Sequence, residues 1–222
     1  MFESKYSKLL TGLLIGGIIV IIGVLIALGI GLSANSSNNK DAADAVEQFQ
    51  GNVSKNKNKT KENVTTNSVA PIIGIENLLV DGNGNTTNRQ MYKGFPMVGT
   101  IEIPSINLKY PVLESASKSA IEVAVAVYDG PGLNKVGNTT IVGHNYRNGT
   151  FFSNLKKVAV GDKIFITYEA GNKVTYVVYN TYTTTPEDSS YLDRDTEGKR
   201  EITLDTCTDD TQSRFLVFAK EQ

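Results

Sequence analysis

The 222-residue sequence contains few of the residues that build metal sites and disulfide frameworks. It has one cysteine, Cys207, and one histidine, His144. Secreted domains generally use cysteines in pairs, and one cysteine with one histidine lacks the usual ligand set of a zinc site. The formal net charge is −1, so no excess of basic residues argues for a nucleic-acid partner. Internal repeats are absent as well. These absences exclude disulfide-rich, zinc-finger, repeat and DNA-binding classes.

Charge is missing from the run Leu9–Leu32. As a helix, these roughly 24 residues would rise about 36 Å, enough to cross a bilayer core of about 30 Å. The alternatives are a buried core helix and a signal peptide cleaved near Ser33, although signal-peptide cores are shorter. Lys5 and Lys8 precede the run, which favours a cytoplasmic N-terminus. We predict cytoplasmic residues 1–8, a single-pass transmembrane signal anchor over residues 9–32 in the cell membrane, and an extracytoplasmic remainder.

Residues 33–92 are poor in apolar side chains and rich in Asn, Lys, Thr, Ser and Asp, especially up to about Ala70. Such composition buries too little surface to offset the entropy lost on ordering. We therefore predict a flexible tether, with a short helix possible over Asp41–Gln50. Pro71–Val80 is more apolar, and its spacing permits an amphipathic turn or two that pack on the following domain, before residues 81–85 break the segment.

Beyond the tether, short runs of β-type residues alternate with turn residues, a pattern typical of all-β domains. Val174, Tyr176 and Val178 alternate with more polar neighbours, as in a half-buried strand. We predict an all-β catalytic domain over residues 93–222, folded as a closed eight-stranded β-barrel with short helical turns. The expected strands are 99–103, 107–112, 124–128, 139–144, 163–168, 173–183, 201–207 and 214–220, and a helical turn is expected at 152–157.

Three chemically capable residues lie at the ends of expected strands. His144 and Cys207 each end a strand, and Arg214 begins the last one. Strand ends can converge at one rim of a barrel while the strands stay rigid. A thiol, an imidazole and a guanidinium together suit acyl transfer, with the thiolate attacking, the imidazole moving protons and the cation stabilising an oxyanion. The sequence alone also allows Cys207 to be an inert buried residue or to form an intermolecular bridge.

Residues 203–207, Thr-Leu-Asp-Thr-Cys, followed by Arg214, resemble the sortase signature Thr-Leu-x-Thr-Cys with a downstream arginine. Residues 99–108 resemble the opening strands of that family, and residues 137–145 resemble its histidine segment. Residues 152–155 and 160–164 resemble the segment that follows. The elements occur in the family's order over about residues 99–220, and they place the signature on the only cysteine and the only histidine.

The resemblance implies a membrane-anchored cysteine transpeptidase of Gram-positive bacteria. Such an enzyme cleaves a C-terminal sorting signal, LPxTG-like or NPxTN-like, through a thioacyl intermediate. It then joins the secreted protein that carried the signal to an amine of a cell-wall peptidoglycan precursor. By the same resemblance Cys207 is the nucleophile, His144 the general acid and base, and Arg214 the peptide-binding and oxyanion-stabilising group.

Further roles also follow from the resemblance. It implies that Thr206, Thr208 and Leu204 bind substrate, with the N–H group of Thr208 as a second oxyanion donor. No cofactor is expected, and calcium is an alternative if Asp209-Asp210, Glu187-Asp188 and Asp193/Asp195 gather into one site. The expected partners are sorting-signal proteins, the cell-wall amine and the bilayer, with no nucleic acid.

The sequence departs from parts of the family in the loop between Cys207 and Arg214. Only residues 208–213 lie there, fewer than in many members, which leaves the sorting motif open. The sequence before Gly99 has no Asp-Pro-aromatic lid, and no second hydrophobic run follows Lys220. We therefore expect a housekeeping-like or class B/D-like branch, not a pilin-polymerising one. The rival interpretations are another extracytoplasmic cysteine hydrolase and a membrane-anchored binding barrel with an inert cysteine.

Overall fold

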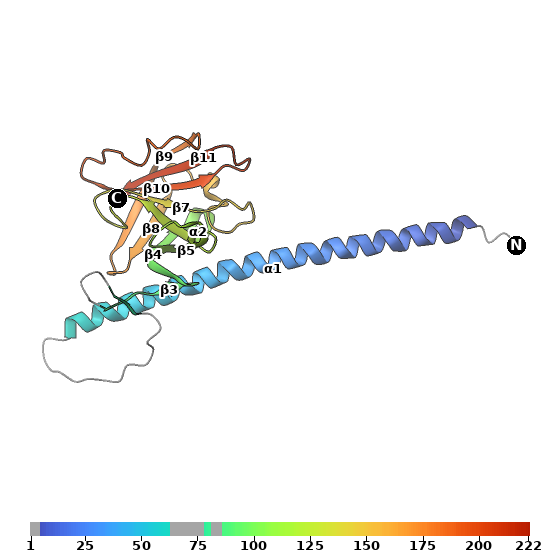
Figure 1. Ribbon diagram of the computed structural model, residues 1–222, viewed down its shortest axis with the longest axis horizontal. Coiled ribbons are helices and arrows are strands. Elements are labelled where there is room, and N and C mark those ends of the chain that lie inside the picture. The colour runs from blue at the N-terminus through green and yellow to red at the C-terminus, as the bar shows by residue number, and fades with distance from the viewer. Residues whose placement is uncertain (1–4, 63–77, 81–85) are drawn as a thin grey trace. The chain divides into compact units, whose positions relative to one another are not determined.

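The computed structural model describes the backbone of residues 5–62, 78–80 and 86–222, with side chains described for residues 13–24, 36–54 and 89–222 (Figure 1). Residue contacts divide the chain into two units, Met1–Asn38 and Asn39–Gln222. A long helix, α1 (Lys5–Glu62), supplies the described part of the first unit and opens the second. Over the described residues, no helix has the length and apolarity that crossing a membrane requires.

Eight strands of the second unit form a closed ring. Their order around the barrel is β4-β5-β6-β7-β10-β11-β9-β8, and β8 pairs with β4 to close it, so the predicted eight-stranded barrel is confirmed. The two-residue strand β3 (Met91–Tyr92) adds to β4 outside the ring. The ring strands are β4 (Phe95–Ile103), β5 (Leu108–Leu113), β6 (Val125–Asp129), β7 (Gly137–Val142), β8 (Lys163–Tyr168), β9 (Lys173–Thr184), β10 (Arg200–Cys207) and β11 (Arg214–Glu221).

The barrel is mixed, because β5 pairs with β6 and β7 pairs with β10 in parallel while the other ring pairs are antiparallel. A parallel pair needs a crossover. The one between β5 and β6 contains the single turn α2 (Lys118–Ile121), which the sequence did not predict. Ser117 caps this turn by accepting a hydrogen bond from the N–H group of Ala120 at 3.1 Å. The described part of the unit also contains two 3₁₀ turns, η2 (Pro104–Ile106) and η3 (Leu155–Lys157), the second within the helical turn expected at 152–157.

Alternation along the strands sorts side chains between the inside and the outside of the barrel. On β10, Ile202 and Leu204 are buried in the main hydrophobic cluster with Ile101, Ile141 and Tyr176 of other elements. The intervening residues of β10 therefore project from the opposite, outer face of the strand. This face carries the polar residues Glu201, Thr203, Asp205 and Cys207.

The structure corrects the predicted tether over residues 33–62, which are helical and belong to α1. Within this helix Ala42, Val46, Phe49 and Val53 are buried. Their spacing of four, three and four residues places them on one helical face, which extends beyond the short helix expected over Asp41–Gln50. One face of this helix is thus apolar despite the polar average of the segment.

This apolar face packs on the barrel. Phe49 and Val53 share a second hydrophobic cluster with Tyr92, Met97 and Leu113. Polar contacts flank the same face. Gln50 Nε2 donates to Glu102 Oε1 at 2.6 Å, and Lys109 Nζ lies 3.2 Å from Glu47 Oε1. The segment from Asn39 to Val53 is therefore a structural part of the barrel unit.

In the sequence, α1 is followed by two short antiparallel strands, β1 (Leu78–Val80) and β2 (Thr86–Asn88), which precede the strands of the barrel. The spacing of Pro71–Val80 permits an amphipathic turn or two, but the last three residues of this segment form β1. The rest of that expectation, residues 71–77, and the break expected at residues 81–85 lie outside the described residues.

Candidate active site

The candidate site lies where three neighbouring strands, β7, β10 and β11, have their ends. Cys207 is the last residue of β10 and Arg214 the first of β11, and the two are direct partners across the antiparallel pair. Strand β7 ends at Val142, two residues earlier than expected, and His144 follows it. The N–H group of Gly143 donates to the Asp205 carbonyl at 3.2 Å, which keeps the two strands together up to His144. Because β7 runs parallel to β10, His144 and Cys207 emerge at the same end of the barrel.

A cavity of about 300 Å³ opens at this end, and His144, Cys207 and Arg214 all line it. The loop between β9 and β10, residues 185–199, contributes further lining through residues 186–189, Tyr191 and Leu192. The three residues that the sequence singled out for chemistry thus face one space. That space also holds side chains from a loop distant in the sequence.

The thiol of Cys207 has a cation beside it. Arg214 Nη1 lies 3.8 Å from Cys207 Sγ, and the cysteine is a free thiol that is partly exposed. The thiolate is the nucleophilic form of a cysteine, and Arg214 places a positive charge beside the sulfur atom that would attack. An accessible thiol next to a guanidinium is suited to nucleophilic attack on a carbonyl carbon.

The imidazole of His144 has a carboxylate neighbour that the sequence did not indicate. His144 Nε2 lies 3.5 Å from Glu122 Oε1 and is buried without a hydrogen-bond partner. The hydroxyl group of Tyr146 donates to Glu122 Oε2, and its ring lies 4.9 Å from the imidazole ring. Burial and then Glu122 raise the pKa of Tyr146 to about 12, so this hydroxyl stays protonated at neutral pH. Glu122 immediately follows α2, and no local pattern links it to His144.

Behind the thiol, the outer face of β10 continues with Asp205. This residue is 2% exposed, and its Oδ1 atom lies 3.7 Å from Arg214 Nη1. Its Oδ2 atom accepts a hydrogen bond from the Tyr191 hydroxyl at 3.0 Å. Burial raises the pKa of Asp205, and the effect is partly offset by Arg214 and Tyr191, both of which favour the carboxylate.

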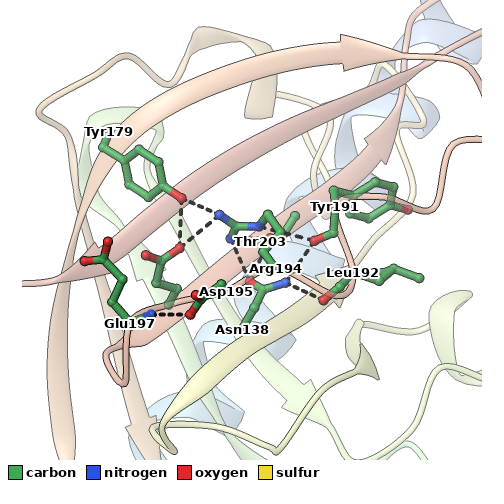
Figure 2. A network of polar contacts seen from close by, with 9 residues as sticks. Asn138, Tyr179, Tyr191, Leu192, Arg194, Asp195, Glu197 and Thr203 are labelled. Carbon is green, nitrogen blue, oxygen red and sulfur yellow. Dashed lines mark hydrogen bonds and ion pairs between the residues drawn. The ribbon is translucent and has the colours of Figure 1, made fainter.

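The loop that brings Tyr191 to this face is held by Arg194 (Figure 2). The Arg194 guanidinium forms an ion pair with Glu201 at 3.0 Å and donates to the Tyr179 hydroxyl. It also donates to Asn138 Oδ1 at 2.9 Å and to Thr203 Oγ1 at 3.2 Å. One cation thereby satisfies polar groups from β7, β9 and β10 and fastens the loop to all three strands.

The same network fixes the backbone at Tyr191 and at the residue that follows it. Asn138 Nδ2 donates to the carbonyl oxygens of Tyr191 at 3.0 Å and Leu192 at 3.1 Å, as Figure 2 shows. Arg194 Nε donates to the Tyr191 carbonyl at 3.3 Å. The Arg194 guanidinium also stacks 4.3 Å from the centre of the Phe218 ring. The loop is therefore attached through its main chain as well as its side chains.

The residues that the resemblance assigned to substrate binding are placed differently. Leu204 is fully buried in the main hydrophobic cluster. Thr206 is also buried, and its hydroxyl donates to the Gly143 carbonyl at 2.7 Å, which joins β10 to the segment before His144. The N–H group of Thr208 donates to the Ser213 carbonyl at 2.9 Å, so in this structure it is not free to be the predicted oxyanion donor. None of the three lines the cavity.

The acidic residues considered for calcium do not gather. Asp209 contacts Lys156 and accepts from Asn145 Nδ2 at 2.9 Å, and hydrogen bonds from these two groups lower its pKa. Asp188 accepts from its neighbour Ser190 at 2.6 Å. Over the part of the chain whose side chains are described, no group of three or more His, Cys, Asp or Glu residues is arranged to hold a metal ion.

Known proteins resemble this chain in sequence and in fold. A family model described as the sortase domain matches residues 101–222. Sortase A of Bacillus anthracis is 34% identical over 125 residues, a match covering 54% of this chain and 58% of that protein. The chain therefore spans less than two thirds of the length of this curated relative.

Two solved structures show the same fold. Sortase A of Corynebacterium diphtheriae, a lid mutant, has a TM-score of 0.53 and 30% identity over 58% of this chain and 71% of its own. The Clostridium perfringens Sortase D5 transpeptidase has a TM-score of 0.57 over 84% of this chain and 99% of its own. At 22% identity, the second comparison speaks to the fold alone.

Proposed function

Because this chain belongs to the sortase family, we propose that it is a cysteine transpeptidase that transfers proteins from a sorting signal to an amine of the cell wall. The observation that supports this most directly is the cavity in which Arg214 Nη1 lies 3.8 Å from Cys207 Sγ and which His144 also lines. A partly exposed thiol, a cation and an imidazole are the groups that acyl transfer requires.

In the proposed reaction, the Cys207 thiolate attacks a backbone carbonyl of the sorting signal, and Arg214 stabilises the resulting oxyanion. The C–N bond breaks, the leaving amine takes a proton from His144, and a thioester joins the substrate to Cys207. An amine of the peptidoglycan precursor then attacks the thioester and gives a proton to His144. The new amide is released and the thiolate is regenerated, so protons and bonds balance over the cycle.

The test is the intact mass of the full-length chain in detergent after incubation with peptides that carry LPxTG-like or NPxTN-like motifs. We expect one peptide to give a peptide-dependent acyl adduct, which triglycine resolves into a ligated product. Cys207→Ala is the matched control and should give neither species. Adduct formation by the Cys207→Ala variant would rule out the nucleophile. An unreactive Cys207, towards both peptides and iodoacetamide, would favour a binding barrel with an inert cysteine.

We further propose that residues 9–32 anchor the protein in the cell membrane, with residues 1–8 cytoplasmic and the barrel outside. The support is the uncharged run in the sequence and the position of Lys5 and Lys8 before it. Alkaline extraction of membranes from expressing cells should leave the full-length chain in the pellet. A variant without residues 1–38 should be released. Release of the full-length chain would contradict the anchor.

A further inference from the structure

We infer that Asp205, together with the Tyr191 hydroxyl, is a positioning residue that holds the Arg214 guanidinium beside the Cys207 thiol. This inference rests on the proposed function, in which Arg214 stabilises the oxyanion. It adds to that function two residues on two different elements, one at the variable position of the Thr-Leu-x-Thr-Cys signature and one in the loop between β9 and β10.

Strand geometry places Asp205 and Arg214 on one surface. Asp205 and Cys207 are two residues apart on β10, so their side chains project from the same face. Arg214 is the direct cross-strand partner of Cys207. The single atom Nη1 of Arg214 lies 3.8 Å from Cys207 Sγ and 3.7 Å from Asp205 Oδ1. The guanidinium thus bridges the thiol and the carboxylate.

Burial leaves the Asp205 carboxylate with few partners. The Oδ1 atom is inaccessible to solvent and accepts no hydrogen bond, so Arg214 is the cation that faces it. The side chain of Arg214 is 37% exposed, whereas that of Asp205 is 3% exposed. A partly exposed arginine has many rotamers, and a fixed buried anion selects those that keep its charge near the site. Preorganised charge is what stabilises a developing oxyanion, since reorganisation at the moment of reaction is then small.

Tyr191 keeps the carboxylate itself in place. Its hydroxyl donates to Asp205 Oδ2 at 3.0 Å, so the two oxygens of Asp205 are oriented in different directions, one to the loop and one to Arg214. The Tyr191 main chain is fixed in turn by Asn138 and Arg194 (Figure 2). Neither Tyr191 nor Asp205 needs to touch the substrate for this effect.

The first experiment observes Arg214 directly and needs no substrate. Two-dimensional ¹⁵N NMR of the arginine side chains, with Arg214 assigned from an Arg214→Lys spectrum, reports whether its guanidinium is restrained. We expect a distinct, slowly rotating Arg214 signal in the wild-type chain and an averaged signal in Asp205→Asn. Tyr191→Phe should show partial averaging. Asp129→Asn removes the same charge from an exposed residue at the end of β6 and should leave the signal unchanged.

The second experiment measures the rate of Cys207 acylation in a double-mutant cycle. We expect Asp205→Asn to slow acylation about tenfold in the wild-type background and to change it less than about twofold in the Arg214→Lys background. Equal losses in both backgrounds, or an Arg214 signal that is unchanged in Asp205→Asn, would overturn the inference. If the wild-type chain acylates no peptide, the proposed function fails, and the NMR comparison still decides whether Asp205 positions Arg214.

Discussion

The buried carboxylate of Asp205 lowers the stability of the folded protein, because a carboxylate loses its hydration when it is buried. It lies next to residues that serve stability, Leu204 on one side and Thr206 on the other, both of them buried. If this position served stability alone, a neutral side chain of the same shape would fill it without the desolvation cost. The charge is therefore best explained by what it does for Arg214.

This cost predicts how stability responds to pH in Asp205→Asn. The pKa of Asp205 is raised in the folded protein, so its ionisation opposes folding. That penalty is absent at pH values below the unfolded pKa of about 3.9 and is complete above the raised folded pKa. We expect Asp205→Asn to have a higher Tm than the wild type at pH 7, with a smaller difference at pH 3.5. Thermal unfolding at the two pH values tests this, and a difference that grows at low pH would contradict it.

Gly143 predicts a second residue-scale effect. A Cβ atom at this position would lie 2.7 Å from Val125 Cγ1 and 2.9 Å from Phe152 Cδ2, closer than such atoms approach in proteins. We expect Gly143→Ala to lower the free energy of unfolding by about 1–3 kcal/mol. It should also slow acylation, because His144 follows directly.

Gly51→Ala is the matched control for this prediction. Its Cβ atom would meet nothing within 4 Å on the exposed side of α1. An alanine in a helix should stabilise the chain by about 0.5–1 kcal/mol. Urea denaturation measures both variants, and the prediction fails if Gly143→Ala is as stable as Gly51→Ala.

Among the elements, the ring strands were predictable and α1 was not. In strands such as β8 and β9, apolar and polar residues alternate with a period of two, and this local pattern does not depend on the neighbouring elements. All eight expected strands are present. The helical face of Ala42, Val46, Phe49 and Val53 is sparse, and its composition alone favours disorder. Only the apolar surface around Met97 and Leu113 explains why it is ordered. That surface belongs to strands remote in sequence, which a local pattern cannot include.

The candidate site likewise contains residues that the sequence identifies and residues that it does not. Cys207, His144 and Arg214 were identifiable because they are rare or lie at strand ends in a recognisable signature. Glu122 and Tyr191 were not, since each reaches the site only through the crossing of distant segments. For Thr208, the sequence cannot show that the turn to Ser213 already uses its N–H group.

The packing of α1 predicts that Phe49→Ala destabilises the barrel unit. Phe49 is 1% exposed and lies in the second hydrophobic cluster. Truncating a buried phenylalanine costs about 3–5 kcal/mol. Gln48→Ala, on the exposed side of the same helix, should change stability by less than about 0.5 kcal/mol. Denaturation curves of the two variants provide the measurement. Equal midpoints would show that the segment is the flexible tether that its composition suggested.

At the scale of the whole molecule, the barrel has no free edge in its ring, since β4 pairs with both β5 and β8. No ring strand can leave without breaking two ladders, so we expect the barrel to unfold cooperatively. Tyrosine fluorescence and the alkylation of Cys207 should therefore give the same midpoint in urea. Alkylation that accelerates well before the fluorescence changes would indicate instead that the loop holding Tyr191 opens by itself.

The two faces of β10 have a consequence for how this enzyme can be altered. Ile202 and Leu204 face inward and pack in the main hydrophobic cluster, whereas Asp205 and Cys207 face outward. The loop over this outer face is held mainly by Arg194. Along this strand, the residues that pack in the core therefore alternate with the residues that form the candidate active site. Residues 186–189 and Leu192 line the cavity but lie outside the main hydrophobic cluster. Substitutions at these positions, with Tyr191 kept, should therefore change the shape of the cavity without removing side chains from the core of the barrel.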